Sequence, residues 1–150
     1  MIKKIFITLL VLLLFGCSYK PIHSGSEYGF SFESISSSGN SQINRVVTNN
    51  LERIKGKNIK YKINFNSAKE KKIISKDAQG DPSIFELKIL INFQIIENKK
   101  VILDNTLIKK NTYNNISDKF ELEKYEDIVT KNLASNIALS ILNTISNVGK

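Results

Sequence analysis

The chain of 150 residues has one cysteine, Cys17, one histidine, His23, and no tryptophan. One cysteine cannot form a disulfide within the chain. Nucleophilic catalysis needs a base beside the nucleophile, and a protein zinc site needs several cysteine or histidine ligands. The sequence also contains no glycine-rich phosphate loop, and the acidic residues at 121–127 are interpreted as a solvated helix start. These absences predict a protein that is not an enzyme, needs no metal or diffusible cofactor, and acts by binding, scaffolding or assembly.

Arginine is also scarce. Arg45 and Arg53 are the only two, although lysine and arginine together number 22 and give a formal net charge of +8. Faces that bind nucleic acid usually combine clustered arginine with aromatic residues. Lysine, asparagine and isoleucine are all abundant and all have A+T-rich codons, so base composition accounts for much of the excess lysine. We expect no nucleic-acid partner, whereas an anionic partner in the cell envelope stays open.

The chain has no apolar run long enough to cross a membrane as a helix. Residues 5–15 (IFITLLVLLLF) are interrupted only by Thr8 and follow Lys3 and Lys4, whereas a membrane-spanning helix needs about 20 apolar residues. A short apolar run behind a basic head is typical of a secretory signal peptide. We therefore predict a signal peptide at 1–16, which is removed.

The boundary of the signal peptide lies in LFGC, residues 14–17, which resembles the bacterial lipoprotein box, with Cys17 as the first residue of the mature chain. In that box the cysteine sulfur receives a diacylglycerol and the new amino terminus is acylated, so Cys17 is predicted to carry these lipids covalently. Several chains hold a protein on a bilayer firmly, whereas one holds it only marginally. Phe15 departs from the small residue usual there, and Ser18 after the cysteine favours release to the outer membrane. The alternatives are a secreted protein with a chance cysteine and a cytoplasmic protein with a buried first helix.

Behind a lipidated tether at 17–27, residues 28–150 are predicted to form a single α+β domain. Alternating apolar residues indicate strands at 28–36, 58–67, 84–96 and 101–112. Helical spacing indicates helices at 41–55, capped by Asn40 or Ser41 with Gly56 just past its end, and at about 118–147, capped by Asp118. Residues 37–41 are interpreted as a turn, and residues 68–83 as a loop or a ragged strand. Tyr125 is expected on the apolar face of the last helix, and the strand residues expected to be buried are Tyr61, Ile63, Phe65, Phe85, Leu87, Ile89, Ile91 and Phe93. The order β-α-β-β-β-α favours a four-stranded mixed β-sheet with both helices packed on one face.

The stretch CSYKPI, residues 17–22, resembles the start of the lipopolysaccharide-assembly lipoproteins, the LptE family. Members begin with a lipidated cysteine, a small residue, an aromatic residue, then a proline and an aliphatic residue. Here Ser18 and Tyr19 stand in place of the commoner glycine and phenylalanine. The family also shares the predicted element order and ends in a long amphipathic helix. The resemblance therefore covers essentially the whole mature chain.

This resemblance implies a function without covalent chemistry. Family members plug the lumen of a large outer-membrane barrel, LptD, help it to fold, and take part in delivering lipopolysaccharide to the outer leaflet. The expected partners are thus an LptD-like barrel, lipopolysaccharide, and the outer membrane through a lipid anchor on its periplasmic side. The alternative is a peripheral envelope lipoprotein that serves as a binding or accessory subunit of another envelope machine.

Two groups of polar residues are candidate contact sites for these partners. Uncharged side chains on one face of the last predicted helix can meet a barrel wall without the cost of burying charge. The alternative is that an A+T-rich genome has enriched asparagine on this face without any partner. These barrel-interface candidates are Asn132, Ser135, Asn136, Ser140, Asn143 and Asn147. Lysines that act as mobile point charges suit phosphorylated sugar lipids; a solvated loop is the alternative. The lipopolysaccharide-contact candidates are Lys69, Lys71, Lys72, Lys76 and, more weakly, Lys124.

Overall fold

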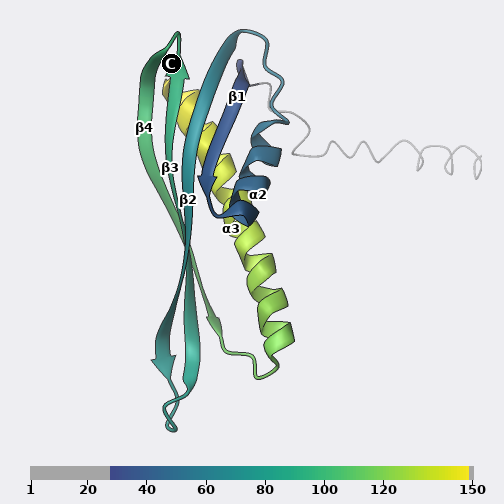
Figure 1. The fold of residues 1–150 in the computed structure, drawn as a ribbon, viewed down its shortest axis with the longest axis vertical. Helices are drawn as coiled ribbons and strands as arrows, with labels where there is room; N and C mark the ends of the chain where they lie inside the picture. Colours follow the sequence, from purple (N-terminus) through teal and green to yellow (C-terminus); the bar gives the residue numbers. More distant parts are fainter. Residues whose placement is uncertain (1–27, 149–150) are drawn as a thin grey trace, which may run out of the picture.

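The computed structural model describes residues 28–148, so the predicted signal peptide, Cys17 and the tether lie outside the described residues. The elements are β1 (Phe30–Gly39), α2 (Ser41–Leu51), β2 (Ile59–Lys76), β3 (Pro82–Glu97), β4 (Lys100–Asn114) and α3 (Lys119–Val148). They form one four-stranded sheet in the order β1-β2-β3-β4, with both helices on one side of it (Figure 1). The predicted α+β architecture is confirmed.

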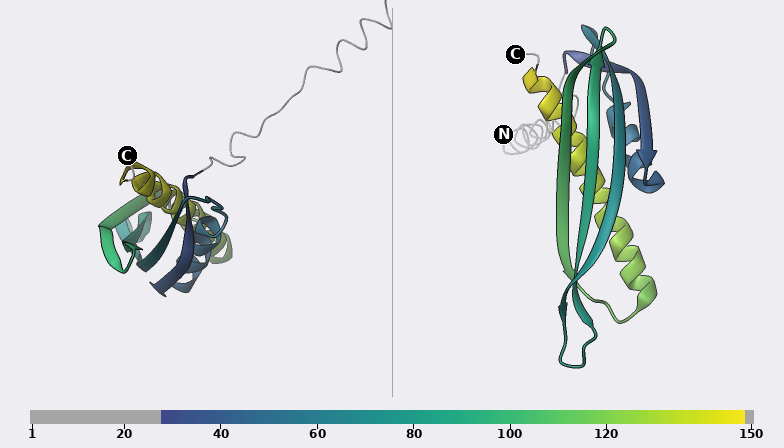
Figure 2. Two further views of the ribbon diagram at one scale, coloured as in Figure 1. Left: turned by 90° about the horizontal axis from the view of Figure 1, so that it is seen from above. Right: turned by 60° about the vertical axis from the view of Figure 1, so that its left-hand side comes forward.

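The sheet combines one parallel and two antiparallel strand pairs. β1 runs parallel to β2, whereas β2 with β3 and β3 with β4 are antiparallel. β2, β3 and β4 are long, at 18, 16 and 15 residues. The tip of the β2–β3 hairpin therefore extends beyond the start of α3 (Figures 1 and 2). This end of the sheet is left without a helix over it.

The core lies between the sheet and the two helices. Alternation along β2 and β3 turns one set of side chains toward the helices. All eight strand residues predicted to be buried there are buried: Tyr61, Ile63, Phe65, Phe85, Leu87, Ile89, Ile91 and Phe93. Against them pack Ile43, Val47 and Leu51 of α2 and a longer apolar row of α3 that includes Ile137 and Ile141. Tyr125, expected on this apolar row, is instead 39% exposed.

The first helix is shorter than predicted. It is capped by Asn40, whose side chain accepts a hydrogen bond from the Ile43 amide, and it ends at Leu51 instead of residue 55. An antiparallel bridge between Lys55 and Ser31 draws the following residues against β1. Gly56 is not a helix cap; a Cβ there would lie 2.0 Å from the carbonyl oxygen of Phe30. The close approach of two backbones, which the local pattern does not encode, ends the helix early.

The observed strand boundaries also differ from the predicted ones. Residues 68–76, interpreted as a loop or a ragged strand, are a regular continuation of β2 because β3 pairs with them. β1 continues through the predicted turn to Gly39, and a register shift between Phe32 and Ser34 brings Ile35 toward the core. Such a bulge moves the following side chains of the strand to the opposite face from the one that simple alternation predicts. At the other helix, Asp118 caps α3 as predicted, accepting hydrogen bonds from the amides of Phe120 and Glu121.

Candidate functional site

The predicted lysine cluster is divided between the two faces of β2. Lys69 and Lys71 are paired with the buried Ile89 and Leu87, so they lie on the helix-facing side. Lys72 is paired with Glu86 on the opposite side. Lys76 lies at the end of the strand, beside the 77–81 turn. The structure thus brings these lysines to one end of the sheet but not onto one surface.

Lys71 is held by an ion pair to the start of α3. Its Nζ lies 2.5 Å from Oε1 of Glu126 and 4.1 Å from the centre of the Phe85 ring. The same carboxylate oxygen accepts a hydrogen bond of 2.7 Å from the hydroxyl of Tyr113 in β4. The Glu126 side chain is 15% exposed and that of Lys71 is 37% exposed. The cluster therefore joins β2, β3, β4 and α3 where the sheet begins to extend past the helix.

The ionisation of this cluster follows from its contacts. Burial by itself would raise the pKa of Glu126, but the hydrogen bonds from Lys71 and Tyr113 outweigh it and hold the pKa below its usual value. Burial, followed by the hydrogen bond to Glu126, raises the pKa of the Tyr113 hydroxyl. At neutral pH the carboxylate is charged and the phenol is neutral. Glu126 thus neutralises one of the lysines that the sequence analysis assigned to an anionic ligand.

Aromatic side chains pack around this ion pair, and exposed apolar side chains lie on the same end of β2 and near the start of α3. Tyr113 packs against Phe85 and Tyr125, with ring centres 5.8 and 5.4 Å apart. Ile73 and Ile74 on the bare end of β2 are 50% and 54% exposed. Near the start of α3, two further large apolar side chains, Phe120 and Ile128, are exposed. We call this end of the sheet, which includes residues of both faces of β2, the basic–aromatic end: Lys69, Lys71, Lys72, Ile73, Ile74, Lys76, Phe85, Tyr113, Phe120, Tyr125, Glu126 and Ile128.

The acidic and aromatic members of this end were not predicted from the sequence. Glu126 was assigned to a solvated helix start, and Tyr113 lies beyond the strand predicted at 101–112. The doublet Ile73–Ile74 inside the lysine run was a usable signal, because adjacent apolar residues on a strand cannot both be buried on one face. Lys124 is exposed, and its Nζ lies 4.0 Å from the carboxylate of Glu121.

The second candidate surface follows the exposed side of α3. Asn132, Asn136, Asn143 and Asn147 are exposed, and Ser135 and Ser140 are partly exposed. Leu139, 45% exposed, lies among them, and the hydroxyl of Ser140 donates to the carbonyl of Asn136. The sequence carries no charged residue from 132 to 149. We call these six predicted residues with Leu139 the uncharged face of α3.

Residues 28–148 contain neither a candidate membrane-spanning helix nor a candidate metal site. No helix in this part of the chain is long and apolar enough to cross a membrane. Within the same residues there is no group of three or more histidine, cysteine, aspartate or glutamate side chains positioned to hold a metal ion. The two surfaces above are therefore the candidates for function that rest on sequence prediction.

The fold is similar to solved structures of bacterial lipoproteins. Rare lipoprotein B from Shewanella oneidensis superposes with a TM-score of 0.61 at 14% identity, covering 77% of this chain and 96% of that one. An uncharacterized lipoprotein B from Nitrosomonas europaea superposes with a TM-score of 0.58 at 15% sequence identity, covering 81% of this chain and 88% of that one. A minor lipoprotein from Acinetobacter baumannii superposes with a TM-score of 0.54 at 15% sequence identity, covering 79% of this chain and 93% of that one. No protein-family model and no curated protein matches the sequence. At these identities the likeness establishes the shared fold.

Proposed function

We propose that this protein is an outer-membrane lipoprotein, anchored through acyl chains on Cys17, that plugs and helps to assemble an LptD-like barrel which delivers lipopolysaccharide to the outer leaflet. The observation that carries the proposal is the shared fold: proteins named as lipoproteins match 77–81% of this chain in three structures. The CSYKPI stretch, which resembles the start of the LptE family, independently favours the same assignment.

The uncharged face of α3 supports a role inside a larger assembly. A helix face that stays in water is normally rich in charge, because charged groups lose most by being buried. Here the exposed positions from Asn132 to Asn147 carry amides and hydroxyls, with the apolar Leu139 among them. Amide and hydroxyl groups can exchange water for hydrogen bonds to a barrel wall at much lower cost than charges can. We therefore assign this face to the barrel.

The basic–aromatic end supports contact with lipopolysaccharide. A phosphorylated glycolipid offers anionic groups beside acyl chains, and this end offers lysines beside exposed Ile73, Ile74 and Phe120. Lys69, Lys72 and Lys76 are the lysines we assign to the phosphates, with Lys124 as a peripheral contributor. Lys71 belongs to the same surface, but its ion pair with Glu126 makes it a support for the others.

The barrel assignment is tested by purifying the protein from native membranes in mild detergent. The wild type should elute with a large β-barrel partner, and the variant Asn136→Glu with Asn143→Glu should lose most of it, because two charges would be buried. The matched control is Asn58→Glu with Gln79→Glu, which adds the same charge at exposed positions away from α3. Elution of the wild type alone would favour the peripheral accessory lipoprotein instead.

The glycolipid assignment is tested by binding of purified lipopolysaccharide. Charge reversal at Lys69, Lys72 and Lys76 should weaken binding about tenfold or more at low salt, with a smaller effect at 0.5 M salt because exposed charges are screened. The control reverses Lys55, Lys57 and Lys60, three exposed lysines at the opposite end of β2. Equal binding by the wild type and both variants would remove the basic–aromatic end from the proposal.

A further inference from the structure

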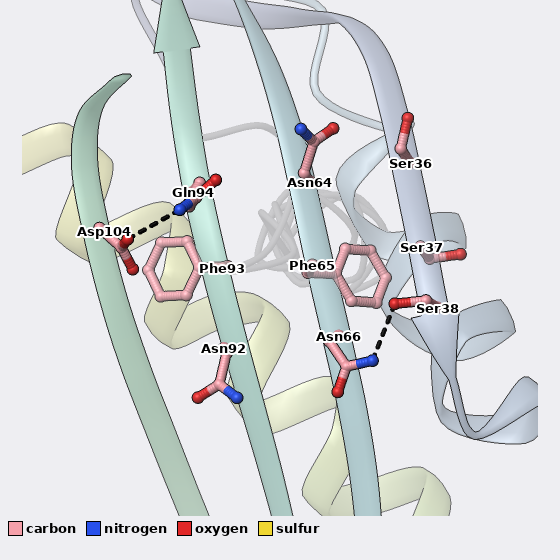
Figure 3. Close-up of a pocket in the computed structure, with 10 residues that line it drawn as sticks. All are labelled: Ser36, Ser37, Ser38, Asn64, Phe65, Asn66, Asn92, Phe93, Gln94 and Asp104. Carbon is pink, nitrogen blue, oxygen red and sulfur yellow. Dashed lines mark hydrogen bonds between the residues drawn. The ribbon is translucent and has the colours of Figure 1, made fainter.

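The sheet face that points away from the helices carries two rows of polar side chains, of which all but Asp104 are uncharged. Strand register aligns each row across all four strands. The first row is Ser36, Asn64, Gln94 and Asp104; the second row is Ser38, Asn66, Asn92 and Thr106. We call these eight residues the amide rows. Seven of them, all but Thr106, line an open groove of about 350 Å³ (Figure 3).

Hydrogen bonds between neighbouring strands hold several of these side chains in place. The amide of Asn66 donates to the hydroxyl of Ser38 at 2.8 Å, and the amide of Gln94 donates to Asp104 at 2.8 Å (Figure 3). In the second row, the hydroxyl of Thr106 donates to the side-chain Oδ1 of Asn92 at 2.7 Å. The row is thus oriented before any ligand arrives, which reduces the entropy lost on binding.

These bonds leave much of the hydrogen-bonding capacity free. A primary amide can donate two hydrogen bonds and accept two. Asn66 and Gln94 each use one N–H in the bonds above, and Asn92 uses only its oxygen. Among the hydrogen bonds found within residues 28–148, none involves the side chain of Asn64. The groove therefore presents both donors and acceptors at close spacing.

Between the amide rows and the hairpin tip, the same face of the sheet has a different composition. Toward the hairpin tip it carries cross-strand ion pairs, Glu70 with Lys88 and Glu86 with Lys110, as a solvated strand surface normally does. Between these pairs and the rows, the register places Ala68 beside Leu90 and Ile108, and Ile108 is 48% exposed. Asparagine is also unfavourable in strands, whereas threonine is favourable, so the use of asparagine at three central positions costs stability that threonine would not.

We propose that the amide rows bind a neutral saccharide chain. Sugar hydroxyls pair with amides and hydroxyls as both donors and acceptors, and the C–H faces of the rings suit the neighbouring Leu90 and Ile108. The only charged group in the groove is Asp104, so a phosphate or another anion has no cation to meet. A protein partner would normally meet a patch enriched in aromatic residues, methionine and arginine at its centre, and the amide rows contain none. The volume lies at the lower end of the range for small-ligand sites.

The test is NMR titration of the isotopically labelled chain, held in a polyoxyethylene detergent that carries no sugar headgroup. The probes are maltoheptaose, the dephosphorylated core oligosaccharide of lipopolysaccharide, and peptide-free glycan strands of peptidoglycan. We expect the backbone amides of Asn64, Asn92 and Gln94 to shift with at least one probe. A response to the core oligosaccharide or to the glycan strands alone identifies the source of the sugar. No response to any probe, or shifts confined to other surfaces, would overturn the proposal.

Variants separate binding from folding. Replacing Asn64 and Asn92 with threonine removes two amides while raising strand propensity, so the melting temperature should hold or rise while the affinity falls at least fivefold. Gln94→Glu provides a second variant of unchanged shape, and it should also bind at least fivefold more weakly. The control replaces Glu70 and Lys88 with threonine on the same face and should bind like the wild type. Unchanged affinity in both groove variants would refute the idea. So would groove variants that no longer co-purify with the barrel, if no saccharide binds to the wild type. Saccharide binding by the isolated chain does not depend on a barrel, so failure here leaves the proposed function standing.

Discussion

The ion pair between Lys71 and Glu126 should couple the bare end of β2 to α3 across 55 positions of sequence. Exposed pairs contribute about 0.2–1 kcal/mol, whereas breaking a buried pair costs about 3–5 kcal/mol. With side chains 37% and 15% exposed, this pair lies between these cases. We therefore expect a coupling free energy of about 1–2 kcal/mol at neutral pH, between these limits.

A double-mutant cycle measures this coupling. Lys71→Met keeps an unbranched side chain at this position but also removes the cation–π contact with Phe85, a loss that is common to the single and double variants and so cancels in the cycle. Glu126→Gln retains an acceptor for the hydroxyl of Tyr113. Urea unfolding of the wild type, both single variants and the double variant in non-ionic detergent gives the four free energies of unfolding. The unrelated pair Lys62 with Glu33, 3.7 Å apart and more than half exposed on both sides, provides the control and should couple by less than about 0.5 kcal/mol.

The coupling should also depend on pH in one direction. Because the pKa of Glu126 is lower in the folded protein than its usual value of 4.5, its stabilising contribution is complete above that value and is lost as the pH falls through the folded pKa. The free-energy difference between the wild type and Glu126→Gln should therefore be constant from pH 6 to 7 and shrink below about pH 4. A coupling energy near zero at pH 7 would show that the contact contributes nothing to folding, and one that persists unchanged at pH 3 would show that the coupling does not depend on the charge of Glu126.

Three further changes test the packing and the turns. Ile137→Ala should lower the free energy of unfolding by about 2–5 kcal/mol, because this fully buried side chain would leave a cavity under the sheet; a loss below 1 kcal/mol in urea unfolding would contradict the core described above. Gly56→Ala should cost about 1–3 kcal/mol, because its Cβ would meet the backbone of Phe30 at 2.0 Å; a neutral effect on thermal unfolding would refute that close approach. Lys99→Gly should stabilise by about 0.5–1 kcal/mol, because Lys99 has a φ of 66°; destabilisation would mean that the turn is not left-handed there.

The basic–aromatic end illustrates how much of a site can be predicted. The sequence identified the lysines, since four of them lie within eight positions, but it could not show that alternation would divide them between two faces of a strand. It also could not pair Lys71 with Glu126, because that contact depends on how α3 crosses the sheet. The uncharged side of α3 was predictable, because helical spacing alone places Asn132, Asn136 and Asn143 together.

The amide rows were beyond prediction for a related reason. The sequence shows amide side chains at alternate positions of two strands, Asn64 and Asn66 in one and Asn92 and Gln94 in the other, and so it shows that each pair shares a face. It does not show which residue of one strand lies opposite which residue of the next, since register depends on turns and bulges throughout the sheet. Only the assembled sheet places Asn66 beside both Asn92 and Ser38.

Local periodicity by itself determined the element order, the buried face of β2 and β3, and the long final helix, because periods of 2 and 3.6 residues are properties of the chain at short range. Tertiary structure decided the rest. Pairing with β3 made residues 68–76 a strand, the approach of β1 ended α2 at Leu51, and packing of α3 brought Glu126 to Lys71. These outcomes depend on contacts between residues far apart in sequence, whose free energy exists only once the chain has folded.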